Sequence, residues 1–291
     1  MELLLLVTQS LIYGIVLGSI ITLGAIGVSL IFGILKFAHF AHGDFMTAGA
    51  YFAFFFVSVF GWPVWAAFPP AAAGLILMSL LVNKVVYQPL SRTRPVILLV
   101  AAIGMALIVR NLVLMIWGPD NVQYASGIEL PYRFAGLRIK ETHFYIVGWA
   151  VAMVVGLHLF LTYTKMGKAM RAMSDDPDLA KISGINTDAV VRWTWAISAT
   201  FATAAGMFLA MDTRLQPDLG WNVLLPVFAA TILGGIGRPY GAIIGAMIVG
   251  ISLEMSTLVI LPSYKPAVAF ALMVAMLIWR PGGLLPPRTA S

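Results

Sequence analysis

The sequence predicts an all-α fold, a polytopic transmembrane helical bundle, from three observations. Of the 291 residues, 60% are hydrophobic and only 10% are charged, whereas about a quarter of the residues in a soluble domain are charged. The mean hydropathy is +0.94. Several apolar stretches of about 20 residues, the length of a membrane-spanning helix, follow one another with short polar breaks. A soluble enzyme, a nucleic-acid-binding module and a disulfide-stabilised scaffold are therefore excluded, and the chain has no cysteine.

The first apolar run covers residues 3–35. As one helix it would be about 50 Å long, which exceeds a hydrocarbon core of roughly 30 Å. We therefore expect it to tilt, bend or break, and its glycines offer places to do so. No basic residue precedes the run, so we expect mature sequence rather than a cleavable signal peptide.

The later spans are expected in order along the chain, giving about 8–9 membrane segments within one transmembrane domain over residues 1–291. The seventh is short, contains Pro226 and ends in three glycines, so it is expected to be broken or re-entrant. The predicted spans are 44–60, 64–87, 96–117, 144–163, 193–211, 223–237, 241–261 and 266–280.

The basic residues in the breaks between spans predict the orientation. Arg92 and Arg94 lie in the break at 88–95, and five more basic residues lie in the longer polar loop at 164–192. Cytoplasmic loops carry an excess of Lys and Arg, so both breaks are expected inside. Counting spans then gives an external N-terminus and a cytoplasmic C-terminus, with Arg280 and Arg288, although a re-entrant seventh segment would change the parity after residue 222.

The polar motifs do not predict catalysis. No phosphate-binding loop is present, because Gly167-Lys168 is followed by Ala169. His39 and His42 are spaced i and i+3, but two histidines without a third ligand favour a polar helix junction at the cytoplasmic end over a metal site. No hydrolase motif of the type G-x-S-x-G occurs. We therefore expect no catalytic, cofactor-binding or metal-binding residue.

The polar loop at 164–192 contains the start and stop pattern of a short helix. Asp176 suits the N-cap, Pro177 the first helical position and Asp178 the first turn, while Gly184 suits the end. These residues predict a helix over about 177–183. It is either a solvated connector or a docking element for a cytosolic partner.

Two ionisable residues, Arg110 and Glu254, fall inside apolar segments, where a lone charge is costly. Each is about 20 Å from the start of its predicted span at 1.5 Å per residue, and both spans start on the inner side. The matched depth predicts an intramembrane ion pair between them. An alternative is that Arg110 binds a carboxylate of a transported solute.

Five segments together resemble the membrane permease subunits of Liv-type ABC importers for branched-chain amino acids, over about residues 10–285. His39 stands where Asn is usual in that family. The five segments are Gly18-Ser19-Ile20 with Gly24 and Leu30-Ile31-Phe32-Gly33; Phe40-Ala41-His42-Gly43-Asp44; Gly167 with Arg171-Ala172, Ala180 and Gly184-Ile185-Asn186; Leu233-Gly234-Gly235-Ile236-Gly237 with Gly241-Ala242 and Gly245-Ala246; and Arg280-Pro281-Gly282-Gly283-Leu284-Leu285.

The resemblance implies roles for two groups of residues. The polar loop becomes the element that meets the ATPase, with Gly167, Arg171, Asp176, Pro177, Asp178, Lys181 and Gly184 in the coupling segment. A helix junction or translocation path is implied at His39, His42, Gly43, Asp44, Gly234, Gly235 and Gly237.

The resemblance also implies a multi-subunit complex in the bacterial inner membrane. Its other members are a second homologous permease, two cytosolic ATP-binding subunits and an extracytoplasmic solute-binding protein, with lipid around the permeases and no nucleic acid. Relatives of this type also carry urea, short amides and aromatic or other small organic acids, so the substrate stays open, as does whether the two permeases are identical.

Two other classes of function fit the sequence less well. An ion-coupled secondary transporter would need carboxylates near the middle of the membrane, and only Glu254 is expected there, with Asp44 near a membrane end. A membrane enzyme would need a catalytic constellation, which is absent. A permease that alternates access when partner ATPases act on it fits best.

Overall fold

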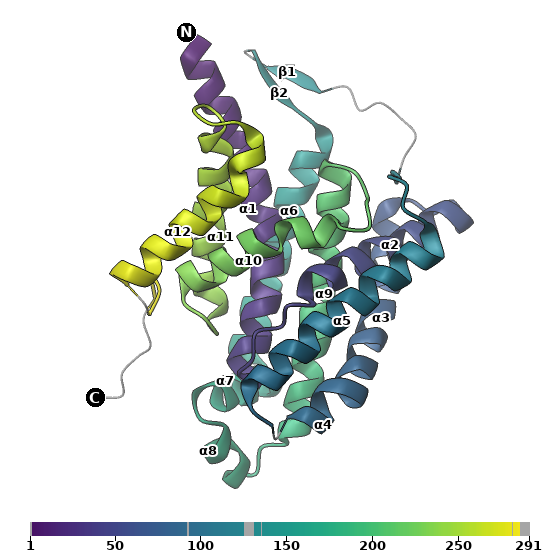
Figure 1. Cartoon of the computed structure of the whole chain (residues 1–291), viewed down its shortest axis with the longest axis vertical. Coiled ribbons are helices and arrows are strands. Elements are labelled where there is room, and N and C mark those ends of the chain that lie inside the picture. Colours follow the sequence, from purple (N-terminus) through teal and green to yellow (C-terminus); the bar gives the residue numbers. More distant parts are fainter. Residues whose placement is uncertain (1, 92, 125–130, 135, 281, 286–291) are drawn as a thin grey trace.

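A computed structural model describes residues 2–91, 93–124, 131–134, 136–280 and 282–285. Three residues named above, Arg92, Pro281 and Arg288, lie outside this set. The described chain is predominantly helical, and long helices pack side by side (Figure 1). The N-terminus and a small hairpin of β1 (Tyr132–Phe134) and β2 (Leu137–Ile139) lie at one end of the bundle, with the polar loop at the other. The predicted polytopic all-α fold is confirmed.

The helices match the predicted spans to within a few residues at most of their ends. Eight helices of the described chain are long and apolar enough to cross a membrane, while α10, with 16 residues, is shorter. The helices are α1 (Glu2–Leu35), α2 (His42–Phe60), α3 (Val64–Val82) continued by a π-helix (Asn83–Tyr87) and α4 (Gln88–Leu90), α5 (Pro95–Trp117), α6 (Glu141–Tyr163), α7 (Lys165–Asp175), α8 (Pro177–Ile182), α9 (Thr187–Asp212), α10 (Leu219–Gly234), α11 (Pro239–Ser256), a 3-10 turn (Pro262–Tyr264) and α12 (Lys265–Trp279).

Helix α1 is one continuous helix of 34 residues and does not break at its glycines. Those glycines instead bring a neighbouring helix close. A Cβ on Gly14 would lie 2.8 Å from the Cα of Ile251 in α11, and a Cβ on Gly250 of α11 would meet the backbone of Gly18. Small residues allow this approach between membrane helices, where packing replaces the hydrophobic effect. The central part of α1 is therefore buried.

The segment 36–41 turns the chain back along the bundle after α1. Lys36 has a φ of 56°, and its Nζ donates to the carbonyl of Ser174 in α7 (2.8 Å). The ring of Phe40 stacks on Phe228 of α10, with centroids 4.8 Å apart. Asp44, in the first turn of α2, contacts Arg110 far along α5, so α2 starts well inside the bundle. His39 and His42 are both buried, which corrects the expected junction at the cytoplasmic end.

Helices α10 and α11 form an antiparallel pair joined by a glycine-rich turn. Gly235 and Gly237 have φ values of 111° and 79°, a left-handed backbone that favours glycine. The C-terminal segment packs on this turn, because the N–H of Leu284 donates to the carbonyl of Leu233 (2.9 Å). Two of the five sequence segments thus meet in space.

Helix α5 has a largely unpacked outer face. It lies across the front of the bundle in Figure 1 and packs mainly on α2. Only a few of its small and aliphatic side chains are buried, while residues such as Ile103, Leu107 and Leu112 are exposed. An apolar face of this kind is covered by lipid or by another membrane helix.

Candidate functional site

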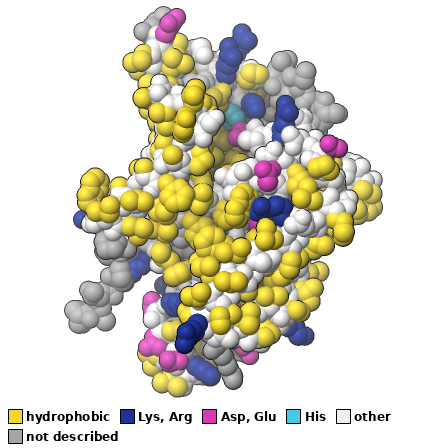
Figure 2. Space-filling model, in the orientation of Figure 1, with side chains coloured by type: hydrophobic (Ala, Val, Ile, Leu, Met, Phe, Trp, Pro, Cys, Tyr) yellow, Lys and Arg dark blue, Asp and Glu magenta, His cyan; other side chains and the backbone are white. Residues whose placement is uncertain are grey.

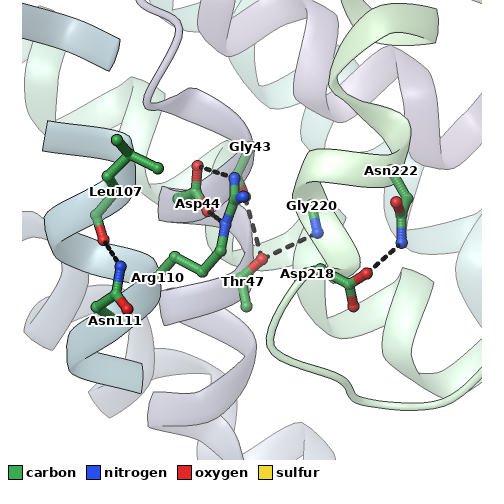
Figure 3. A network of polar contacts seen from close by, with 9 residues as sticks. All are labelled: Gly43, Asp44, Thr47, Leu107, Arg110, Asn111, Asp218, Gly220 and Asn222. Carbon is green, nitrogen blue, oxygen red and sulfur yellow. Dashed lines mark hydrogen bonds and ion pairs between the residues drawn. The ribbon is translucent and has the colours of Figure 1, made fainter. Parts of the chain in front are cut away.

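A network of polar contacts centres on an ion pair between Arg110 of α5 and Asp44 of α2 (Figure 3). The Nε of Arg110 donates to Oδ1 of Asp44 (2.9 Å), and Nη2 donates to Oδ2 (3.1 Å). The carboxylate is fully buried, whereas the arginine side chain is 19% exposed. The ring of Trp221 in α10 covers the guanidinium, with its centroid 4.4 Å from Cζ. Three helices therefore meet at this pair.

Helices α2 and α10 touch through two glycines beside the ion pair. A Cβ on Gly43 would lie 2.5 Å from the carbonyl oxygen of Gly220. The Thr47 hydroxyl joins the same two residues, because it accepts from the N–H of Gly220 (2.9 Å) and donates to the carbonyl of Gly43 (3.3 Å). The conformation of α2 near Asp44 is thereby fixed against the start of α10, as Figure 3 shows.

Further polar side chains surround the pair on the outward side. Asn222 donates from Nδ2 to Asp218 (3.1 Å), and Asn111 donates to the carbonyl of Leu107 (2.7 Å). Asp218, Asn222 and Asn111 are exposed. A polar or charged residue in a membrane segment faces the protein interior or water. This face is therefore suited to a water-filled space.

A half-buried tyrosine in the loop after α5 contacts α2 three residues beyond Thr47. The Tyr124 hydroxyl donates to the carbonyl of Ala50 in α2 (2.8 Å). Burial raises the pKa of the Tyr124 phenol well above its usual range, so it remains a neutral donor. The loop is held in place by antiparallel hydrogen bonds between Val122 and Leu215 (3.0 Å each way).

His39 and His42 belong to an aromatic cluster rather than to a ligand set. The Nδ1 of His39 lies 3.2 Å from the Tyr87 hydroxyl, and its ring packs edge-on against Trp195. His42 packs against Gly27 of α1, where a Cβ would lie 2.5 Å from Cε1 of the imidazole. Among the described residues, no three His, Cys, Asp or Glu side chains are grouped so that they could hold a metal ion.

The predicted ion pair between Arg110 and Glu254 is wrong, because each residue has another partner. Glu254 accepts from Nζ of Lys265 at 2.5 Å, whereas Arg110 binds Asp44. The predicted span 241–261 ran beyond the true end of the helix, so it placed Glu254 too far from the outer end of its span. Helix α11 ends at Ser256, so Glu254 lies in its last turn and reaches the first residue of α12. Recognising 36–41 as a returning segment would have shown Asp44 at the depth of Arg110.

The glycines Gly234, Gly235 and Gly237 lie away from this pair, at the turn between α10 and α11. Gly234 packs against the backbone of Gly241, and Gly237 packs against Gly33 of α1. Their positions make them part of a helix junction. The structure therefore divides the predicted junction and path residues between two places, because His39, His42, Gly43 and Asp44 lie at the start of α2.

The predicted short helix in the polar loop is confirmed as α8 (Pro177–Ile182). Oδ1 of Asp176 accepts from the N–H groups of Asp178 (3.0 Å) and Leu179 (2.9 Å), and Gly184, with a φ of 82°, follows the helix. Ala180 is its only buried residue. Leu179 and Ile182 are 57% and 81% exposed, an exposure that was not predicted.

Helix α7, the amphipathic helix before α8, was not predicted either. The Thr164 hydroxyl caps it by accepting from the N–H of Gly167 (2.9 Å), and Gly167 fits tightly against the backbone of α6. Met170 and Met173 are buried on one face, and Arg171 is exposed on the other. The spacing of the methionines and the threonine cap were readable in the sequence.

A cavity of about 480 Å³ lies at the same end of the bundle as α7 and α8. It is formed where α1, the π-helix, α5 and α9 come together. Its charged lining residues are Lys84, Asp188 and Arg192, and Phe37 and Tyr87 supply aromatic surface. The cavity shares no residue with the Arg110 cluster.

The fold and the sites together define a multi-pass helical membrane protein with a polar cluster inside the bundle and a capped helix at one end. In overall fold the chain is similar to a chain of PsaBC from Streptococcus pneumoniae, solved in complex with a Fab. The TM-score is 0.54 at 15% sequence identity, covering 94% of this chain and 92% of the other.

The chain matches the family described as branched-chain amino acid transport system / permease component over residues 10–277, and it belongs to that family. LivH of Escherichia coli K12, a high-affinity branched-chain amino acid transport system permease protein, is 32% identical, over 95% of this chain and 94% of LivH. BraD of Pseudomonas aeruginosa is 30% identical over 95% of both chains. LivM of Escherichia coli K12 is 27% identical, over 90% of this chain and 66% of LivM.

Proposed function

We propose that this chain is the membrane-spanning permease subunit of an ATP-binding-cassette importer. Its solute is a branched-chain amino acid or a similar small polar organic molecule. The similarity to LivH and BraD over almost the full length of each protein supports this function. The whole chain acts as one permease domain. It is a transport subunit and not an enzyme, since ATP is hydrolysed in separate subunits.

The observation that carries the proposal is the exposure of α8. Leu179 and Ile182 are apolar and exposed on a rigid, capped helix at one end of the bundle (Figure 1). Exposed apolar side chains rimmed by polar residues are typical of a protein interaction site, and Asp178 and Lys181 are exposed beside them. We assign this helix, with α7 behind it, to contact with a cytosolic ATP-binding subunit.

The charge distribution supports an orientation in which α8 is cytoplasmic. The basic polar loop at 164–192 and the turn near α4 lie at the same end of the bundle, and positive loops remain inside. The N-terminus and the β1–β2 hairpin then lie outside, where an extracytoplasmic solute-binding protein docks. The C-terminal end is cytoplasmic, and the membrane is the bacterial inner membrane.

A second, homologous permease completes the membrane part of the complex. Its contact surface is the outward face of α5 and the adjoining part of α10, where polar side chains lie within an otherwise apolar surface (Figure 2). Lipid would be a poor solvent for Arg110, Asn111 and Asp218. A water-filled path between two permeases accommodates them, and two ATP-binding subunits then act on the pair.

Affinity purification of the tagged chain from its own cells tests the docking role of α8. We expect a P-loop ATPase and a second permease to co-purify with it. A Leu179→Asp and Ile182→Asp double variant should lose the ATPase and keep the second permease. Tyr132→Asp, which changes an exposed apolar residue at the opposite end, is the matched control and should keep both. The proposal fails if the wild-type chain retains no ATPase, and α8 is not the docking element if the double variant retains it fully.

A further inference from the structure

Arg110 uses only part of its hydrogen-bonding capacity. A guanidinium has five N–H donors in a fixed planar fork. Nε and one N–H of Nη2 are directed at Asp44, while Nη1 has no hydrogen-bond partner among the described residues. The buried carboxylate occupies one edge of the fork, and the arginine side chain is 19% exposed. The free donors therefore face away from Asp44.

The surroundings restrict how a ligand can reach these donors. Trp221 covers one face of the guanidinium at 4.4 Å, so an incoming group is directed to the free edge, in the plane of the fork. A carboxylate can accept two parallel hydrogen bonds from such a planar fork. Trp221 is itself 45% exposed and offers apolar surface beside the edge for the side chain of an amino acid.

Asp218, close to Trp221 in the sequence, supplies a negative group for the ammonium end of an amino acid. Asp218 immediately precedes α10 and is exposed, and only the Asn222 amide contacts its carboxylate among the hydrogen bonds of the described chain. Trp221 lies in the first turn of α10, three residues after Asp218. A zwitterion would therefore meet a cationic donor and a carboxylate on one surface.

We propose that the free edge of Arg110 binds the carboxylate of the solute during its passage, and that Asp44 is the positioning residue that holds the guanidinium. This inference rests on the proposed function, because the outward face must border the solute path. A carboxylate that crosses a low-dielectric region needs a compensating charge along its route. The pairing with Asp44 keeps the site nearly neutral overall, so the solute is held weakly enough to leave again.

The test uses the complete transporter, purified with its ATP-binding subunits and second permease and reconstituted in liposomes with its solute-binding protein. Radiolabelled leucine is the probe. The informative double variant is Asp44→Asn with Arg110→Gln, which replaces the ion pair by two neutral amides that can still hydrogen-bond and removes the cation. The matched control is Glu254→Gln with Lys265→Met. It removes a second ion pair between described membrane helices, which does not touch Arg110 or Asp44.

We expect the double amide variant to yield folded complex and to lower the maximal rate of ATP-driven leucine uptake per complex by about tenfold or more. A loss of that size corresponds to one charge-assisted hydrogen bond. The KM for the loaded binding protein should be unchanged, since the site acts after delivery. The control should transport like the wild type. Arg110→Lys, which keeps the charge but lacks the planar fork, should give an intermediate rate.

Any other outcome contradicts either the role of Arg110 in solute binding or the proposed importer function. If the double amide variant transports at the wild-type rate, the pair is only structural and the inference is overturned. The same holds if the variant raises KM without changing the maximal rate, or if the control loses transport equally. If the wild-type complex imports no solute with ATP, the proposed function itself fails, independently of Arg110.

Discussion

A methyl group at Gly43 should separate α2 from α10 and destabilise the polar cluster. The Cβ of alanine would lie 2.5 Å from the carbonyl oxygen of Gly220, about 0.9 Å short of the 3.4 Å at which ordinary contact begins. The obstacle is backbone, so no side chain can move aside. Overpacking of this kind costs about 1–3 kcal/mol. Displacing α10 also strains the Thr47–Gly220 hydrogen bond, which contributes about 1 kcal/mol.

The two effects together predict that Gly43→Ala destabilises the protein by about 2–4 kcal/mol. For a chain of this size, a loss of 1 kcal/mol lowers the melting temperature by about 2–4 °C. We therefore expect the midpoint to fall by roughly 5–15 °C. The assay heats the purified protein in detergent and follows the fraction that stays monodisperse on gel filtration. Gly43→Leu should leave little folded protein.

The matched control is Gly148→Ala in α6, where a Cβ would meet nothing within 4 Å. Alanine is favoured over glycine in a helix by about 1 kcal/mol, so this variant should melt at or above the wild-type temperature. A Gly43→Ala protein that melts with the wild type would show that α2 and α10 do not depend on this close contact, and the packing argument would be refuted.

Three further predictions concern helix α8 and the hydrogen bonds of Thr47. Reversing a charge on α8, by Asp178→Lys or Lys181→Glu, should uncouple ATP hydrolysis from uptake while leaving membrane insertion intact; normal uptake per ATP would exclude α8 from coupling. Asp176→Ala should remove the cap of α8, at a cost of about 1 kcal/mol, and increase amide exchange over 178–182 several-fold, whereas unchanged exchange would contradict the role of the cap. Thr47→Val should lower stability by about 1 kcal/mol, measured by the same melting assay, with Thr47→Ser near wild type; equal melting of both would show that the hydroxyl contributes little.

The local patterns of the sequence predicted the helices well, because each span is long and apolar enough to be read without its neighbours. The α8 helix was predictable for a similar reason: Asp176, Pro177 and Gly184 act within a few residues of one another. The sequence left open whether α1 tilts as one helix, bends or breaks, since its glycines fit each of these. Their contacts with α11 are tertiary, and no local pattern distinguishes close packing from a kink.

The central ion pair could not be predicted by counting residues from a membrane surface. That count assumes that every span begins at the surface, and α2 does not. The segment 36–41 carries the chain back along the bundle, so Asp44 reaches Arg110, the sixteenth residue of α5. The count held for Glu254, which is likewise the sixteenth residue of its helix, but α11 ends only two residues later, at Ser256, and Glu254 pairs with Lys265 instead. Depth in a membrane depends on tertiary path as well as on sequence position.

The most direct test of the central claim is the energy source of transport. The purified complex, with its solute-binding protein outside the liposomes, is supplied with radiolabelled leucine, and ATP with magnesium is placed so that it reaches the ATP-binding subunits. We predict accumulation that requires ATP hydrolysis, stops with a non-hydrolysable analogue and persists when sodium and proton gradients are collapsed. Uptake that follows an ion gradient and ignores ATP would contradict the assignment of this chain to an ATP-binding-cassette importer.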